Sequence, residues 1–452
     1  MSAPKITELG TASIRSLLLK YAMPGIIAMT AMSLYNMVDS IFIGHGVGAM
    51  ALSGLTVAKP FMDICAAFGT LVGVGASSLV AIKLGEKDYR SANDVLANVI
   101  LLNVLLGAIV MAVGLFWLDP ILYAFGASDE TIVYARDYME IILWGNILTH
   151  IYYGLNGMLR SIGHPKVSMY ATILAVVINI ILDPIFIFVL DMGVRGAALA
   201  TMISQLVSVV IELVIFLNPK EVIYFHRGIW RLKRDITMRA LGIGTAPFLM
   251  HMASCFVVIV LNNQLKRYGG DMAIATFGIT NRFMFFFAMI VMGLNQGMQP
   301  IVGYNYGAKL FDRMVRALKL TAMCATCVMG VLWLFGLVWP EGFIRLFTHD
   351  ELLIAQSVVP ARVMLCTMVM VGFPMVVGNF YTSIGMSGKA IFLSLTRQVI
   401  FLIPCILLMP LLFQTLNFTP IWGVWWSLPI CDALAAILAA IILNRDMRKF
   451  SV

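Results

Sequence analysis

The chain has 452 residues, of which 61% are hydrophobic and only 12% are charged. Soluble globular proteins contain roughly 45–50% apolar and about 25% charged residues, so the composition excludes a soluble enzyme, a disordered protein and a coiled-coil rod. The net charge of +8 does not by itself indicate a nucleic-acid partner, because basic cytoplasmic loops give a membrane protein the same excess.

Long apolar runs follow one another along the whole chain, and each can cross a bilayer as a helix. The apolar residues suffice for about a dozen spans of about 20 residues. We predict an all-α polytopic membrane protein with 12 transmembrane helices, because unpaired backbone cannot cross lipid. The predicted spans are residues 17–43, 55–84, 92–118, 131–158, 167–190, 195–217, 237–262, 273–303, 315–339, 352–384, 390–414 and 420–443.

The second half of the chain repeats the first at a constant offset of 222 residues. Each half holds six predicted spans, so both halves enter the membrane from the same side, an arrangement typical of secondary transporters. We predict an N-terminal lobe (1–217), a cytoplasmic linker (218–236) and a C-terminal lobe (237–452). The matching pairs include Gly75 and Gly297, Gly85 and Gly307, Gly114 and Gly336, Trp117 and Trp339, and Phe125 and Phe347.

Lysine and arginine indicate the orientation of the chain. Most of the 31 basic residues lie near the termini, in the central loop, or in the other loops on the same side of the membrane as the termini. The positive-inside rule then places both termini in the cytoplasm, with a multi-pass chain in the cytoplasmic membrane. In this assignment Lys389 and Arg397 both belong to the cytoplasmic loop after the tenth span.

The chain lacks the short motifs of ATP-driven pumps and of the common hydrolases. No GxxxxGK[ST] phosphate loop, HExxH motif or catalytic Ser–His grouping occurs. We therefore do not expect an enzyme, and we expect no cofactor.

Carboxylates inside the spans are the strongest candidates for function, because a charge in a bilayer is costly. Asp39 lies toward the outer end of the first span, and Asn179 and Asp183 share a helix face in the fifth. Such oxygen ligands can bind Na⁺, and a buried Asp can instead exchange protons. The alternative is that both acids have only structural roles. Asp39 would then cap a helix end, and Asp183 would pair with a neighbouring amide. The other acids within or near the ends of spans are Asp63, Glu140, Glu212 and Asp432.

The second half does not repeat these acids. Near the start of each half the match is shifted by one residue more, as Pro24 and Pro247 show, so Asn262 stands where Asp39 would recur; Cys405 stands where Asp183 would recur. We therefore predict that cation coupling belongs to the N-terminal half.

Methionine is unusually frequent, with 31 residues. Its flexible, polarizable side chain suits the packing of membrane helices, and it equally suits a cavity wall that adapts to varied apolar ligands. On the second interpretation, Met29, Met252 and Met284 are candidates for the wall of a substrate cavity.

Several motifs together resemble the multidrug and toxic compound extrusion (MATE) transporters, in particular their prokaryotic DinF-like and MepA-like branch. The resemblance covers essentially the whole chain. The residues that carry it are Pro24, Tyr35-Asn36-Met37-Val38-Asp39, Ala51-Leu52-Ser53-Gly54, Gly154-Leu155-Asn156-Gly157-Met158-Leu159-Arg160-Ser161-Ile162-Gly163, Asn179, Leu182-Asp183-Pro184 and Gly196-Ala197-Ala198-Leu199-Ala200-Thr201.

This resemblance implies a V-shaped bundle of two lobes around a central cleft. It implies an antiporter that exports organic cations and hydrophobic drugs in exchange for H⁺ or Na⁺, with small-molecule substrates and a lipid bilayer as partners. We expect no nucleic-acid partner and a monomer. By resemblance, Asp39, Asn179, Asp183 and Thr201 form the cation and proton network, which would also hold Na⁺, and Tyr35, Asn36 and Asn156 line the N-terminal lobe.

A lipid-linked oligosaccharide or peptidoglycan-precursor flippase of the same superfamily is the alternative function. Such a flippase needs basic residues in its cavity to hold a pyrophosphate. The predicted spans offer more acids than bases, with Lys59 and Arg282 as exceptions, and both of these can extend to the membrane interface instead.

Overall fold

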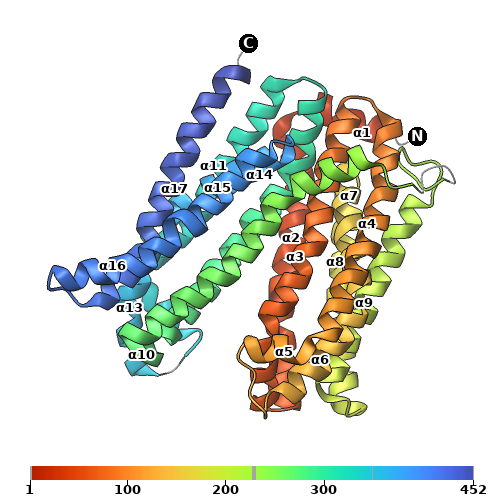
Figure 1. Ribbon diagram of the computed structural model, residues 1–452. Coiled ribbons are helices and arrows are strands. Elements are labelled where there is room, and N and C mark those ends of the chain that lie inside the picture. Colours follow the sequence, from red (N-terminus) through yellow and green to blue (C-terminus); the bar gives the residue numbers. More distant parts are fainter. Residues whose placement is uncertain (1–2, 227–230, 349, 451–452) are drawn as a thin grey trace.

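Helices account for nearly all of the chain (Figure 1). A computed structural model describes residues 3–226, 231–348 and 350–450. No strand occurs within these ranges, as expected for a chain whose backbone groups must be satisfied inside a bilayer.

The first half forms a bundle of helices that we call the N lobe. A short helix, α1, precedes it, and a π-helical turn, η1, extends α8 beyond Pro184. The elements are α1 (Ala3–Thr11), α2 (Ile14–Gly46), α3 (Ala49–Gly85), α4 (Tyr89–Phe116), α5 (Leu118–Ala124), α6 (Ile132–Trp144), α7 (Asn146–Ser161), α8 (Pro165–Pro184), η1 (Ile185–Val189) and α9 (Gly193–Phe216).

The second half forms the C lobe. Its first element, α10, begins within the predicted linker and contains two spans, because Gly270 (φ 66°) reverses the chain at a single non-helical residue. The elements are α10 (Arg234–Gly307), α11 (Phe311–Val338), α12 (Pro340–Arg345), α13 (Glu351–Leu365), α14 (Met368–Ser383), α15 (Ser387–Leu395), η2 (Thr396–Leu402), α16 (Ile403–Thr415) and α17 (Pro420–Phe450).

The all-helical membrane fold is confirmed. Ten helices in the described ranges are each long and apolar enough to span a membrane, and the pair α13 and α14, bent by 45°, makes an eleventh. The pair α6 and α7 occupies the equivalent place in the N lobe. Both α4 and α7 begin and end 222 residues before α11 and α14, so the repeat found in the sequence is also a repeat of the structure.

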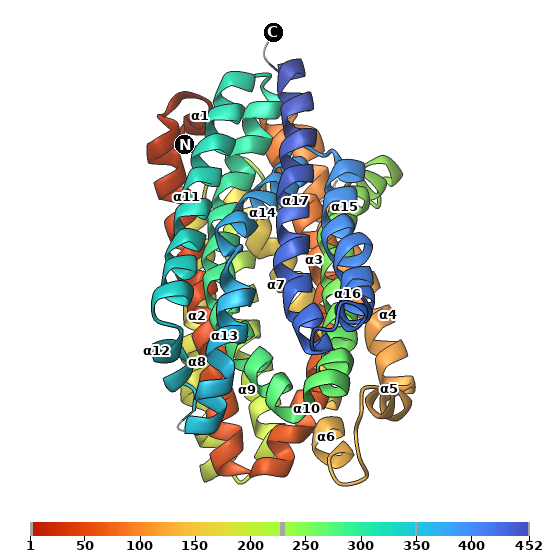
Figure 2. The same ribbon diagram turned by 90° about the vertical axis from the view of Figure 1, so that its left-hand side faces the viewer.

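The two lobes meet at one end and diverge at the other (Figure 1). Seen from the side of the C lobe, the N-lobe helices lie behind α13, α14 and α17 (Figure 2). Both termini lie at the end where the lobes meet. We call this the closed end and the opposite one the open end.

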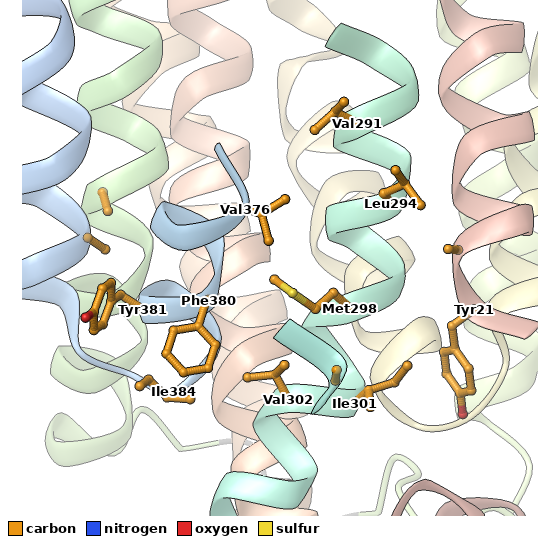
Figure 3. Close-up of a cluster of buried hydrophobic side chains, with 14 of the residues drawn as sticks. Tyr21, Val291, Leu294, Met298, Ile301, Val302, Val376, Phe380, Tyr381 and Ile384 are labelled. Carbon is orange, nitrogen blue, oxygen red and sulfur yellow. The ribbon is translucent and has the colours of Figure 1, made fainter. Parts of the chain in front are cut away.

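The distribution of the hydrophobic core explains this shape. One buried cluster joins the lobes, with Met298 and Ile301 of α10 lying between Tyr21 of α2 and Phe380 of α14 (Figure 3). Two smaller clusters each belong to one lobe, around Met139 in the N lobe and around Trp425 in the C lobe. The apolar surface that holds the lobes together is therefore concentrated at the closed end.

Close backbone contact seals the closed end. A Cβ atom built on Gly85 of α3 would lie 2.0 Å from the carbonyl oxygen of Tyr304, and one on Gly307 of α10 would lie 2.1 Å from that of Ile82. These contacts are reciprocal, because each glycine is matched by the one 222 positions away. Only glycine allows the two backbones to approach this closely.

Candidate functional site

A cavity of about 390 Å³ lies between the lobes. Helices α2, α3, α7 and α8 of the N lobe and α10, α14, α15, η2 and α17 of the C lobe supply its walls. Its size is that of pockets that hold drug-sized ligands. The ionisable side chains of its wall are Asp63, Arg160, His251 and Arg397, and its methionines are Met29, Met32, Met250, Met289, Met292 and Met375.

Two of the residues predicted for a substrate cavity, Met29 and Asn156, line this space. Met252 does not, because it follows the lining residue Met250 by two positions and so points about 200° away around the helix. Met284 packs instead among the buried apolar clusters. Asn36 lies outside the described side chains.

Inside the N lobe, away from the cavity wall, the structure brings the predicted coupling residues together. Asp39 comes from α2, Asn179 and Asp183 from α8, and Thr201 from α9. The Asn179 amide is satisfied when its nitrogen donates to Asp183 Oδ2 at 2.8 Å and its oxygen accepts from the backbone N–H of Thr201 at 3.1 Å. The Tyr35 hydroxyl lies 3.1 Å from Thr201 Oγ1, so Tyr35 belongs to this network rather than to the cavity wall.

The side chains of Asp39 and Asp183 lie close enough to interact directly with each other. Asp183 is fully buried and Asp39 is 9% exposed. One oxygen of each, Oδ1, has no hydrogen-bond partner among the described residues. Two carboxylates this close cannot both remain charged without a proton or a cation between them. This carboxyl pair is therefore chemically suited to take up and release a small cation.

The donor set favours a proton or an alkali ion. Among the described residues there is no group of three or more His, Cys, Asp or Glu that could hold a metal ion. The network offers two carboxyls, one amide and the hydroxyls of Thr201 and Tyr35. These are hard oxygen ligands with a total charge low enough for a monovalent ion, and the sequence-based assignment to H⁺ or Na⁺ stays a prediction.

Sequence reasoning missed one member of this network. Tyr138 of α6 is buried, and its side chain interacts with that of Thr201. Tyr138 stands in the run Arg136-Asp137-Tyr138-Met139-Glu140 near a predicted span end, and nothing there distinguishes it from an ordinary packing residue.

The C lobe contains a partly buried ion pair that corrects a sequence-based assignment. Arg397, predicted in a cytoplasmic loop, lies in η2 within the span Ser387–Thr415 and lines the cavity. Its guanidinium contacts Asp432 Oδ1 of α17 through two nitrogens, at 2.8 and 2.9 Å. Asp432 offsets the charge that would otherwise exclude an arginine from this depth.

We expect Arg397→Gln to destabilise the protein. The change leaves the carboxylate of Asp432, which is 4% exposed, without its cation. Breaking a fully buried pair in this way costs about 3–5 kcal/mol, and we expect a smaller loss here because the Arg397 side chain is 30% exposed. A thermal unfolding assay in detergent measures the loss. The double variant Arg397→Gln/Asp432→Asn should regain most of it, and equal stabilities of the single and double variants would contradict the assignment.

Several known proteins are similar to this chain in sequence and in fold. The family model for MatE matches residues 24–185 and 240–407. Multidrug export protein MepA of Staphylococcus aureus (strain MRSA252) is 28% identical over 426 residues, covering 94% of this chain and 92% of that protein. The solved structure of the MATE multidrug transporter DinF-BH in complex with a ligand is 36% identical, covers 98% of both chains and has a TM-score of 0.90.

A MOP superfamily transporter from Pyrococcus furiosus, described as having a binding pocket of reverse polarity, has a TM-score of 0.92 at 23% identity. It covers 99% of this chain and 98% of its own. At that identity the similarity concerns the fold alone.

Proposed function

Because the chain belongs to the MatE family, we propose that it is an antiporter that exports organic cations and hydrophobic drugs in exchange for H⁺ or Na⁺. It is a transporter and not an enzyme. The observation that carries the proposal is the contact between the Asp39 and Asp183 carboxyls, buried in one lobe and separate from the cavity. The descriptions of MepA as a multidrug export protein and of DinF-BH as a multidrug transporter support the class of cargo.

Helix α2 is the element that connects the coupling ion with the cargo. One turn of it, containing Met29 and Met32, lines the cavity, and the next turns carry Tyr35 and Asp39 into the carboxyl network. Pro24 lies inside this helix and removes one backbone hydrogen bond, which makes a bend easier. Loading or emptying the carboxyl pair changes the packing of α2 against α8, and α2 transmits that change to the cavity wall.

The direction of transport follows from the position of the termini. If both lie in the cytoplasm, as the basic loops predict, the closed end faces the cytoplasm and the cavity opens outward. The arrangement is then the one from which cargo leaves and the coupling ion enters. We further propose that the chain functions as a monomer in the cytoplasmic membrane.

The flippase alternative requires cations that are free to hold a pyrophosphate. The two arginines of the cavity wall are already engaged, Arg397 by Asp432 and Arg160 by Asn156 and Ser168. The acid on the wall, Asp63, pairs with Lys59 at 2.5 Å. With both arginines and Asp63 engaged in this way, the cavity favours bulky, weakly hydrated cargo over a polyanion.

The coupling ion is identified by separating the two gradients. Purified protein in proteoliposomes is given either a Na⁺ gradient at equal pH or a pH gradient without Na⁺, and the movement of a fluorescent organic cation is followed. We expect uptake against its gradient in at least one of the two conditions, because the carboxyl pair binds a monovalent ion. Movement that follows only the cargo's own gradient in both conditions would contradict antiport.

A further inference from the structure

Glu212 is an acid inside the membrane that the coupling network does not use. It lies in α9, one turn before the helix ends at Phe216, and its side chain is fully buried. Among the described residues it has no ion-pair partner. By contrast, Asp63 pairs with Lys59 and Asp432 with Arg397, and Asp39 and Asp183 together form the carboxyl pair of the coupling network.

An amide joins Glu212 to a cation at the cavity wall. Asn156 Nδ2 donates to Glu212 Oε1 at 2.8 Å, and Asn156 Oδ1 accepts from Arg160 at 2.5 Å. Ser168 Oγ also donates to Asn156 Oδ1, at 2.9 Å. The second carboxyl oxygen of Glu212, Oε2, is buried and has no partner among the described residues.

Glu212 and Arg160 stand on opposite sides of this amide. Asn156 and Arg160 line the cavity, and Glu212 lies behind them in the lobe. With an ionised Glu212, the carboxylate and the guanidinium polarise the amide between them and their charges balance. With a protonated Glu212, the charge of Arg160 faces the cavity without compensation and repels a cationic cargo.

The surroundings of Glu212 contain few other ionisable groups. Helix α7 presents Tyr152 and Arg160, and α8 presents neutral hydroxyls, with the Tyr152 hydroxyl 2.9 Å from Thr172 Oγ1. The groups that α2 and α6 direct at α9, including Asp39 and Tyr138, lie beside Thr201, about three turns away. The next charged groups toward the closed end are His164 and Glu221, which pair with each other at 3.0 Å.

We propose that Glu212 is a second proton-binding group of the N lobe, whose protonation weakens the binding of cationic cargo through Arg160. The reaction is the addition of one proton to the carboxylate, at the free Oε2, with no other bond changed. This inference rests on the proposed antiport function and extends it. The bound proton then weakens the binding of the cargo, and the bound cargo weakens the binding of the proton. Antiport requires this relation between the two ligands.

The test uses tetraphenylphosphonium, a cation that carries no titratable proton. We expect its addition to the purified protein in weak buffer to release protons, measured with a pH indicator. In Glu212→Gln, which mimics the neutral acid, we expect fewer protons released and an affinity at least threefold lower at high pH, with a weaker dependence on pH. Glu140→Gln, an acid of α6 at the surface beside Arg195, is the matched control and should behave like the wild type.

Unchanged affinity and unchanged proton release in a folded Glu212→Gln variant would overturn the inference. If that variant does not fold, the wild type is treated with dicyclohexylcarbodiimide, which modifies protonated carboxyls, and the peptides are analysed by mass spectrometry. We expect modification of Glu212 at low pH and protection by tetraphenylphosphonium, and no modification at any pH overturns the inference. The antiport proposal is tested separately, by the proteoliposome experiment above. It fails if neither the Na⁺ gradient nor the pH gradient drives the cargo.

Discussion

Replacing either Asp39 or Asp183 by asparagine is expected to lower ion-driven efflux at least tenfold while the protein still folds. Asparagine keeps the size and hydrogen-bonding groups of the side chain but can neither lose a proton nor supply a negative charge. Each single variant leaves one carboxyl able to accept from the new amide, so the contact between α2 and α8 survives. The measurement is the efflux of a fluorescent organic cation from proteoliposomes energised by the coupling ion.

The controls separate coupling from folding and from cargo binding. Asp129→Asn alters an exposed acid that accepts a hydrogen bond from Tyr123, and it should leave efflux unchanged. Both coupling variants should still bind the cation, because neither acid lines the cavity. Energised efflux at the wild-type rate in either coupling variant would show that the carboxyl pair does not carry the coupling ion.

Sequence reasoning could identify the coupling network because its signal is local. An acid inside an apolar span is costly wherever it lies, so Asp39 and Asp183 were recognisable without any knowledge of the fold. Asn179 was recognisable because it shares a helix face with Asp183, and the resemblance to a known family then added Thr201. The structure places all four side chains at one point of the N lobe, where α2, α8 and α9 meet.

The cavity wall was harder to predict because it depends on how each helix is rotated. Met250 and Met252 have the same chemistry and nearly the same position, but only Met250 faces the other lobe. The first half of α10 is apolar on most sides, so the sequence has no polar face that fixes its rotation.

The position of Arg397 depended on a partner far along the chain. Counting basic residues places an arginine near a span end in the nearest loop, but Asp432, 35 residues later, holds Arg397 within the membrane. Glu212 presents the same difficulty, because Asn156 and Arg160 lie more than 50 residues earlier and become its neighbours only when α7 packs against α9.

Packing at the closed end predicts that Gly244→Ala prevents the two lobes from meeting there as they do in this structure. A Cβ atom on Gly244 of α10 would lie 1.7 Å from the carbonyl oxygen of Leu71 in α3, well under the 3.0 Å that real Cβ atoms respect. A backbone carbonyl cannot rotate away like a side chain, so the helices must separate by at least about 1.3 Å. Overpacking of this kind costs about 1–3 kcal/mol, which shifts a two-state equilibrium by roughly 5–150-fold.

The shift should favour a state in which the lobes part at the closed end and approach at the open end. Spin labels at Glu130 and Gln414, both exposed, in a variant without native cysteines should report a shorter distance in Gly244→Ala. Efflux should fall at least fivefold, because the outward-open state becomes rare. Gly242→Ala is the matched control, since its Cβ would meet only Ser387 Oγ at 4.0 Å. If both variants keep the wild-type distance and efflux, close contact at Gly244 does not hold the lobes in this arrangement.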